Sequence, residues 1–190
     1  MPNLKDLKIR IDSVKSTQKI TSAMKMVAAA KLRRAQDSAE AARPYAERME
    51  RMLGSLAQSV AGTEGMPKLL AGTGLNDTHL IVAFTADRGL CGGFNSSIIR
   101  QVRTMASEFK VAGKNFKIFC VGRKGHDVLK RDFPDNIINS VEGLGRRGVE
   151  YQEAMKIALN ITESFDLGHF DICTIVFNRF QSAITQIVTP

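Results

Sequence analysis

The feature that most constrains this 190-residue chain is a heptad repeat of apolar and small residues over its first third. Numbered from Leu4 as position a, the a and d positions (here called the seam) keep one register up to Val60. A 3.5-residue apolar repeat this long is typical of a coiled coil, whereas globular helices average about 10–14 residues. An unbroken helix here would span roughly 85 Å at about 1.5 Å per residue. The large apolar seam residues are Leu4, Leu7, Ile11, Val14, Leu32, Met49, Leu53 and Leu56.

Local signals support one long helix. Asn3, followed three residues later by Asp6, resembles an N-cap with an acidic partner. Pro44 lies inside the repeat and removes one helix hydrogen bond, so we expect a kinked but continuous helix. Opposite charges at i, i+4 predict ion pairs on the helix surface near both ends. These pairs are Asp6–Arg10 and Glu47 with Arg43 and Arg51.

The middle of this helix is basic and carries a second apolar face. Residues 1–36 hold nine Lys or Arg against Asp6 and Asp12, which accounts for +7 of the chain's net charge of +8. Ile20, Met24 and Val27 fall outside the seam, so their stripe points away from a coiled-coil partner. An unneutralised segment of this kind needs an anionic partner, which can be nucleic acid, acidic lipid or an acidic protein surface.

The seam has no partner within the sequence. The other amphipathic segment, residues 149–165, is about a third as long. The partner is therefore expected to be another chain, or a later segment of a longer chain of which this sequence is a fragment. The sequence stops at Pro190, directly after what reads as a strand.

The rest of the chain alternates between strand and helix patterns. We divide the sequence into a helix over 1–61, a Gly/Pro-punctuated linker over 62–77 and a domain over 78–190. Short apolar runs suit strands buried on both faces of a parallel sheet, and their alternation with helices predicts an α/β, Rossmann-like domain with a mostly parallel sheet. The expected strands are 79–86, 117–122, 137–141, 171–178 and 184–188, with helices over about 95–111, 123–132 and 149–165.

Residues 85–97, TADRGLCGGFNSS, join the first expected strand to the first expected helix. Such a turn is where α/β folds bind phosphate. Its G-x-x-G-G spacing matches neither the dinucleotide fingerprint nor the P-loop, so we expect glycines that serve a tight turn; a nucleotide-binding enzyme stays open as an alternative. The turn residues of interest are Asp87, Arg88, Gly89, Cys91, Gly92, Gly93 and Asn95.

The remaining reactive residues form no recognisable set. The cysteines, at 91, 120 and 173, are widely spaced without a CxxC pair, which favours a reducing compartment with the last two in strand cores. We expect the histidines, at 79, 126 and 169, to lie on the surface or in loops. No apolar run approaches the length of about 18 residues that a membrane span needs.

Several motifs together resemble one family. The segment LKDLKIRIDSVKSTQKITSAMKMVAAAKLRRAQ is similar to the N-terminal helix of the gamma subunit of F-type ATP synthase, and TADRGLCGGFN is similar to that family's signature turn. ARPYAERM, GRKG, GRRG and IVFNRFQSAITQ follow in the family's order. The family's C-terminal helix, which coils against the N-terminal one, is missing here.

The resemblance implies a non-catalytic rotor subunit with no cofactor and no metal. Its shaft would turn inside a hexamer of alpha and beta subunits, and its α/β domain would meet the epsilon subunit and the membrane c-ring. It implies peripheral association with the cytoplasmic face of a bacterial inner membrane, or alternatively the matrix side of the mitochondrial one. The residues implied to meet the acidic loop of the beta subunit are Met24, Lys25, Lys31, Arg33 and Arg34.

A basic segment followed by heptads also describes a basic-zipper DNA-binding protein. Against that alternative, the d positions Ala35 and Ala42 are small, Pro44 falls inside the zipper, and an α/β domain follows.

Overall fold

The computed structural model describes residues 3–60, 65–145, 148–182 and 184–190. The chain divides into two compact units, residues 1–66 and 67–190. The fold class predicted from the sequence, a long N-terminal helix followed by a mostly parallel α/β domain, is confirmed.

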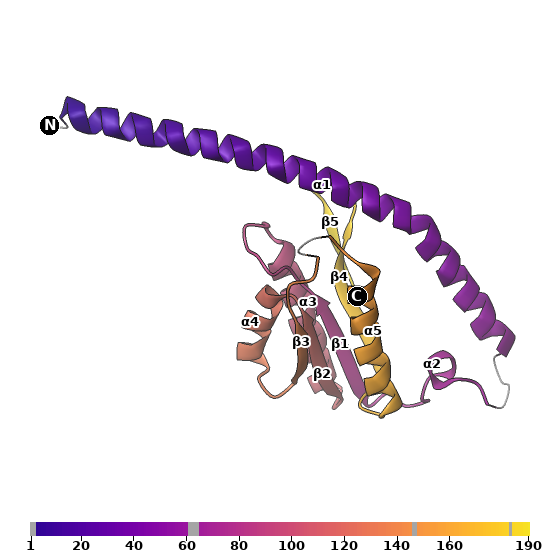
Figure 1. The fold of residues 1–190 in the computed structure, drawn as a ribbon. Helices are drawn as coiled ribbons and strands as arrows, with labels where there is room; N and C mark the ends of the chain where they lie inside the picture. The colour runs from indigo at the N-terminus through magenta and orange to yellow at the C-terminus, as the bar shows by residue number, and fades with distance from the viewer. Residues whose placement is uncertain (1–2, 61–64, 146–147, 183) are drawn as a thin grey trace. The chain divides into compact units, whose positions relative to one another are not determined.

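The first unit contains helix α1, Leu4–Val60, which has 57 residues and continues through Pro44. Figure 1 shows it as one unbroken, curved helix. Asn3 caps its start, since the Asn3 main-chain oxygen accepts from the Leu7 N–H at 3.1 Å and the Asn3 side chain accepts from the Lys5 N–H at 3.3 Å. None of the residues of α1, all of which the structure describes, is buried. Packing within the chain therefore does not account for this helix.

The second unit is built on a five-stranded sheet in the order β3-β2-β1-β4-β5. The strands are β1 Thr78–Phe84, β2 Asn115–Val121, β3 Ile137–Val141, β4 Ile172–Phe180 and β5 Gln186–Thr189. The pairs β3–β2, β2–β1 and β1–β4 are parallel, and β5 runs antiparallel to β4. The centre of β1 is buried on both faces, as its continuous apolar run predicts.

Helices cover both faces of this sheet (Figure 1). Helix α3, Phe94–Val111, and helix α4, Arg123–Asp132, pack on one face around Ile81, Ile118 and Leu129. Helix α5, Tyr151–Asp166, packs on the other through Ile157 and Phe165. A short helix, α2, Lys68–Ala71, lies within the segment that the sequence analysis treated as linker.

The expectation that His79 lies on the surface or in a loop is wrong. His79 is in β1, on the same face as Ile81 two residues later, and only 7% of it is exposed. Its ring stacks on Phe109 of α3 with 4.1 Å between centroids, and its Nε2 has no hydrogen-bond partner among the described residues. Burial, assisted by the nearby Lys114 charge, lowers the pKa of His79, against the opposing influence of Asp171.

Candidate functional site

The second apolar face of α1 lies open to solvent. Ile20, Met24 and Val27 are 59%, 59% and 56% exposed. The basic residues predicted to accompany them are exposed as well: Lys25, Lys31, Arg33 and Arg34. The structure thus places all five predicted interface residues on the helix surface, which leaves them available to a partner but does not identify that partner.

Among the described residues, no carboxylate forms an ion pair with this basic segment. The ion pairs of the described residues are Arg103–Asp132 and Arg123–Glu142, both in the α/β domain. The prediction of ion pairs near the ends of α1, between Asp6 and Arg10 and between Glu47 and its neighbouring arginines, is therefore wrong. Arg51 Nε instead donates to the main-chain oxygen of Glu47 at 3.2 Å, because a long flexible side chain at a wet surface gains little from a carboxylate partner.

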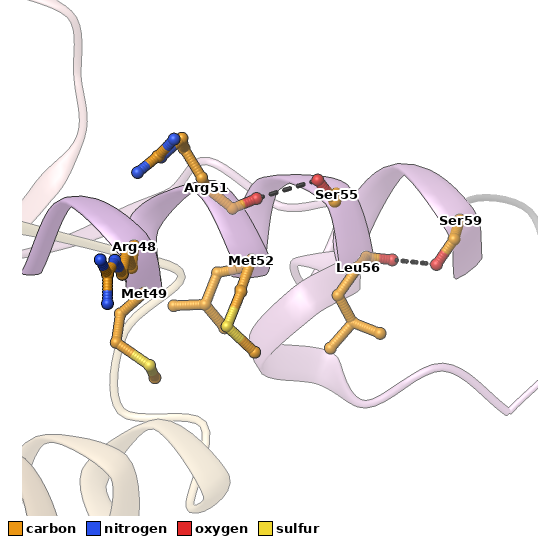
Figure 2. Close-up of a pocket in the computed structure, with 8 residues that line it drawn as sticks. Arg48, Met49, Arg51, Met52, Ser55, Leu56 and Ser59 are labelled. Carbon is orange, nitrogen blue, oxygen red and sulfur yellow. Dashed lines mark hydrogen bonds between the residues drawn. The ribbon is translucent and has the colours of Figure 1, made fainter. Parts of the chain in front are cut away.

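The large seam residues of α1 are likewise exposed, from Leu4 to Leu56. Towards its C-terminal end, α1 carries a shallow hollow in which Met49, Met52 and Leu56 project from one side of the helix, as Figure 2 shows. Nearby hydroxyls bond to helix carbonyls, with Ser55 Oγ at 3.0 Å from the Arg51 oxygen and Ser59 Oγ at 2.9 Å from the Leu56 oxygen. The apolar side chains are thus left as the available contact surface.

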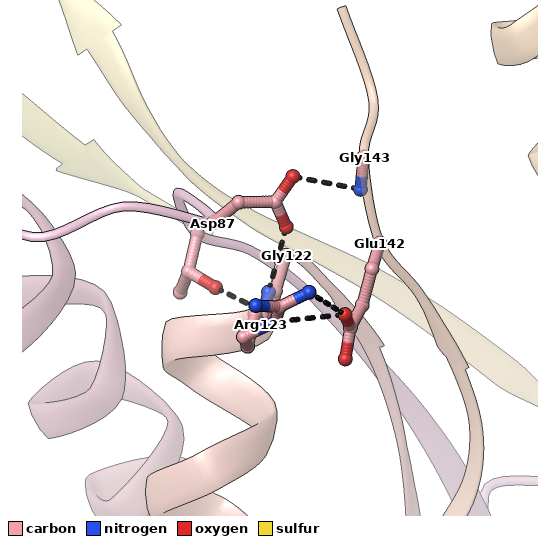
Figure 3. Close-up of polar contacts among 6 residues, drawn as sticks. Asp87, Gly122, Arg123, Glu142 and Gly143 are labelled. Atoms are coloured by element: carbon pink, nitrogen blue, oxygen red, sulfur yellow. Dashed lines mark hydrogen bonds and ion pairs between the residues drawn. The ribbon is translucent and has the colours of Figure 1, made fainter. Parts of the chain in front are cut away.

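The signature turn is held by Asp87, at the carboxyl ends of the strands. One Asp87 carboxylate oxygen accepts from the Arg123 N–H at 3.0 Å, and the other accepts from the Gly143 N–H at 2.7 Å. Arg123 also pairs with Glu142 at 2.7 Å, and Figure 3 shows all of these contacts. Asp87 thus joins the ends of β1, β2 and β3. Its carboxylate lies at the N-terminus of α4, where a doubly wound fold would otherwise hold an anion.

Asn95 closes the other side of the turn. Its Oδ1 accepts from the Ala86 N–H at 2.8 Å, and its Nδ2 lies 3.1 Å from Cys91 Sγ. Between these anchors, Leu90 is fully exposed and adopts a φ of 62°, which is uncommon for a residue with a side chain. These contacts describe a tight turn held by its own side chains. None of them places an acidic or basic side chain against the Cys91 thiol.

The sequence analysis did not predict a close contact beside this turn, in which Thr85 packs against Gly122 and Gly125. Thr85 Oγ1 accepts from the Gly125 N–H at 2.9 Å and donates towards the carbonyls of Val121 and Gly122 at 3.2 Å. A Cβ at Gly125 would lie 2.5 Å from Thr85 Oγ1, and one at Gly122 would overlap the Thr85 carbonyl. Both glycines belong to the GRKG motif, so that motif marks a close approach of α4 to β1.

The α/β domain also exposes an apolar patch, the open sheet face, formed by Ile175, Phe177 and Ile187. Ile175 and Phe177 follow Cys173 at two-residue spacing on the side of β4 that faces α5. Ile187 of β5 shares that side, because it pairs with Arg179. Exposed apolar residues gathered in this way favour a protein contact.

The described residues lack the constituents of a metal site or a membrane span. No group of three or more His, Cys, Asp or Glu side chains among them could hold a metal ion. No helix in this part of the chain is long and apolar enough to cross a membrane.

The structure joins a long helix without buried residues, whose apolar seam is exposed, to a well-packed α/β domain, and an exposed apolar seam of this length is typical of a helix that packs against a partner. A sequence profile of the family described as ATP synthase matches residues 3–190. The ATP synthase gamma chains of Rhodospirillum rubrum and Paramagnetospirillum magneticum are 59% and 58% identical over 189 residues, which are 100% of this chain and 63% and 64% of theirs. The chain belongs to the ATP synthase gamma chain family.

A solved structure agrees with this assignment. A chain from the central stalk and c-ring of the Tetrahymena thermophila mitochondrial ATP synthase matches with a TM-score of 0.68 and 33% identity, over 90% of this chain and 70% of that one. The family assignment removes the support for the basic-zipper and nucleotide-enzyme alternatives. This chain spans less than two thirds of the length of the curated relatives.

Proposed function

We propose that the chain acts as the rotor of the central stalk of a proton-translocating F-type ATP synthase. It couples proton flow through the c-ring to the conformational cycle of the catalytic beta subunits, and it holds no catalytic group itself. The observation that carries this proposal is the exposed face of α1 around Met24, which is basic and apolar and forms no ion pair with the other residues that the structure describes.

This face has the chemistry that a moving contact requires. Exposed pairs of Lys or Arg with carboxylates contribute about 0–1 kcal/mol each, so an acidic loop can be bound and released at every step. Methionine is unbranched and polarizable, which suits a surface that meets several neighbours in turn. Driving a two-state site from 1:99 to 99:1 takes about 5.5 kcal/mol of differential contact, which several weak contacts supply together.

The partners follow from the same assignment. Met24, Lys25, Lys31, Arg33 and Arg34 contact the acidic loop of the beta subunit within the alpha–beta hexamer. The α/β domain meets the epsilon subunit and the c-ring, and its open sheet face is an apolar surface suited to such a contact. In this proposal the chain lies at the cytoplasmic face of the bacterial inner membrane, as a peripheral subunit. The matrix side of the mitochondrial membrane is the alternative.

The test is Met24→Lys in the complete complex, with Met26→Lys as a matched control. Both methionines are more than half exposed, but two residues on a helix turn Met26 about 200° away from Met24. A fixed charge beside Lys25 strengthens contacts that have to break, so we expect proton pumping to fall much more than ATP hydrolysis. Met26→Lys leaves both rates unchanged. Equal losses of pumping and hydrolysis in Met24→Lys membranes would argue against the proposal.

A further inference from the structure

The segment that leads into β1 lies on the α/β domain without burying a side chain. Residues 67–77, here called the strap, belong to the second compact unit, and none of them is buried. Lys68, Leu69 and Gly72 of the strap line one side of a cavity of about 300 Å³, and α5 and Phe170 line another. Side chains that border a cavity lack packing partners on that side. Apolar packing therefore contributes little to holding the strap in place.

One carboxylate, that of Asp171, holds the strap through polar contacts. Its Oδ2 accepts from the N–H groups of Asp77 at 3.0 Å and Thr78 at 2.9 Å. Its Oδ1 accepts from the Thr73 hydroxyl at 3.3 Å, and its own N–H donates to the Thr78 carbonyl at 2.8 Å. Asp171 directly precedes β4, so these contacts fasten the strap and the start of β1 to the start of β4.

The same contacts keep the carboxylate charged. The Thr78 N–H is the main cause that lowers the pKa of Asp171, and the Asp77 N–H and the Thr73 hydroxyl lower it further, although burial opposes them. Hydrogen bonds to an ionised acceptor are roughly twice as strong as those between neutral groups. Asp171 therefore holds the strap with its stronger, charged form at neutral pH.

The end of the strap is also fastened on the other side of β1. The Asp77 carbonyl accepts from the N–H of Asn115, the first residue of β2, at 2.8 Å. Strand β1 lies between β2 and β4 and is parallel to both. A pull on the strap therefore reaches the amino ends of three strands together: β1 through the chain itself, β4 through Asp171, and β2 through Asn115.

We propose that Asp171 is a load-bearing clasp, through which force passes between α1 and the sheet. The chain runs from α1 into the strap, so in the proposed rotor torque on α1 loads the strap. Without the clasp, that load would fall on β1 and on the single contact with β2. The inference takes only the source of the load from the rotor function, because bearing load is a property that the chain can show by itself.

The experiment is constant-force pulling of single chains with optical tweezers. One handle is attached to Met66→Cys, just ahead of the strap, and the other to the native Cys91, which is exposed beyond β1. All chains carry Cys173→Ser, and Cys120 is buried. The measured quantity is the time for which the folded domain survives at a fixed force, since forced unfolding reports the unfolding rate.

Two substitutions of Asp171 test the clasp. Asp171→Ala removes every side-chain contact with the strap, and we expect the survival time to fall at least about tenfold. Asp171→Asn keeps the shape and one acceptor oxygen but removes the charge, so its survival time should lie between those of Asp171→Ala and the unsubstituted chain. Asp135→Asn is the matched control, because Asp135 is an exposed carboxylate shortly ahead of β3, and it should leave the survival time unchanged.

A second pair of handles separates load bearing from a general loss of stability. Handles on Val111→Cys, which is 88% exposed at the end of α3, and on Cys91 load α3 and bypass the strap. The shortening caused by Asp171→Asn should be confined to the pull through the strap. Equal shortening through both pairs of handles, or no shortening through the strap, overturns the proposal. Neither result depends on the membrane assay of Met24→Lys, so failure of the rotor function and failure of the clasp are distinguishable.

Discussion

Gly125→Ala tests whether the close contact of Thr85 with Gly125, where β1 meets α4, stabilises the α/β domain. Gly125 lies in the first turn of α4, where alanine would ordinarily stabilise a helix by about 1 kcal/mol relative to glycine. Here the added Cβ would lie 2.5 Å from Thr85 Oγ1 and 2.8 Å from Thr85 Cγ2. Thr85 would have to move away, and with it the hydrogen bond from the Gly125 N–H.

The expected magnitude follows from these opposing contributions. Overpacking of this kind costs about 1–3 kcal/mol. Weakening this partly buried hydrogen bond costs about another 0.5–1.5 kcal/mol. Against the helical gain of about 1 kcal/mol, the net expectation is a loss of roughly 1–3 kcal/mol in the free energy of unfolding of the α/β domain.

Urea unfolding, monitored by hydrogen exchange of β1 and β2 peptides, measures this loss for the α/β domain alone. Thr85→Ala removes the side chain that the new Cβ meets, so the double variant should lose less than the sum of the two single losses. Gly54→Ala, in helix α1 of the other unit, is the negative control: nothing lies within 4 Å of a Cβ built there, and the exchange of the β1 and β2 peptides should not change. A stabilised Gly125→Ala domain, or strictly additive losses, would refute the role assigned to Thr85.

Two further predictions concern single side chains of the α/β domain. The lowered pKa of His79 means that the folded state binds fewer protons than the unfolded state, so stability is lost as the pH falls below the unfolded value of about 6.5. His79→Phe, which keeps a ring against Phe109, should flatten this dependence in urea unfolding between about pH 5 and pH 7; an unchanged slope would contradict it. Asp87→Ala leaves the N–H groups of Arg123 and Gly143 without their acceptor, and we expect a loss of about 1–3 kcal/mol. Titration of the unsubstituted chain with ATP should reveal no saturable site at this turn, and saturable binding there would show that Asp87 does not fill the anion position.

Local patterns predicted the elements of the α/β domain because each buried strand is a continuous apolar run. The run that begins at His79 became β1, and IINSV became the shorter strand β3. The order of the strands was not predictable, because parallel pairing joins residues far apart in sequence and leaves no periodic signal. The antiparallel direction of β5 depends on such a non-local pairing with β4.

The site was predicted unevenly for physical reasons. The exposed face around Met24 followed from helical spacing and from the absence of acidic residues, which are local properties. His79 was misassigned because a lone histidine was read by its type, although its two-residue spacing from Ile81 placed it on the core face of β1. The contacts of Thr85 with Gly122 and Gly125 span 37 and 40 residues and appear only when β1 and α4 come together.

The two units differ in what makes them stable, and this difference bears on how a rotor could work. The α/β domain has its own core on both faces of the sheet, so it can fold without partners. Helix α1 has no buried residue, so its stiffness must come from whatever helix occupies its seam. The face around Met24 lies outside that seam. One helix can therefore be held firmly along its seam while its basic face exchanges weak contacts, which is the combination that transmission of torque requires.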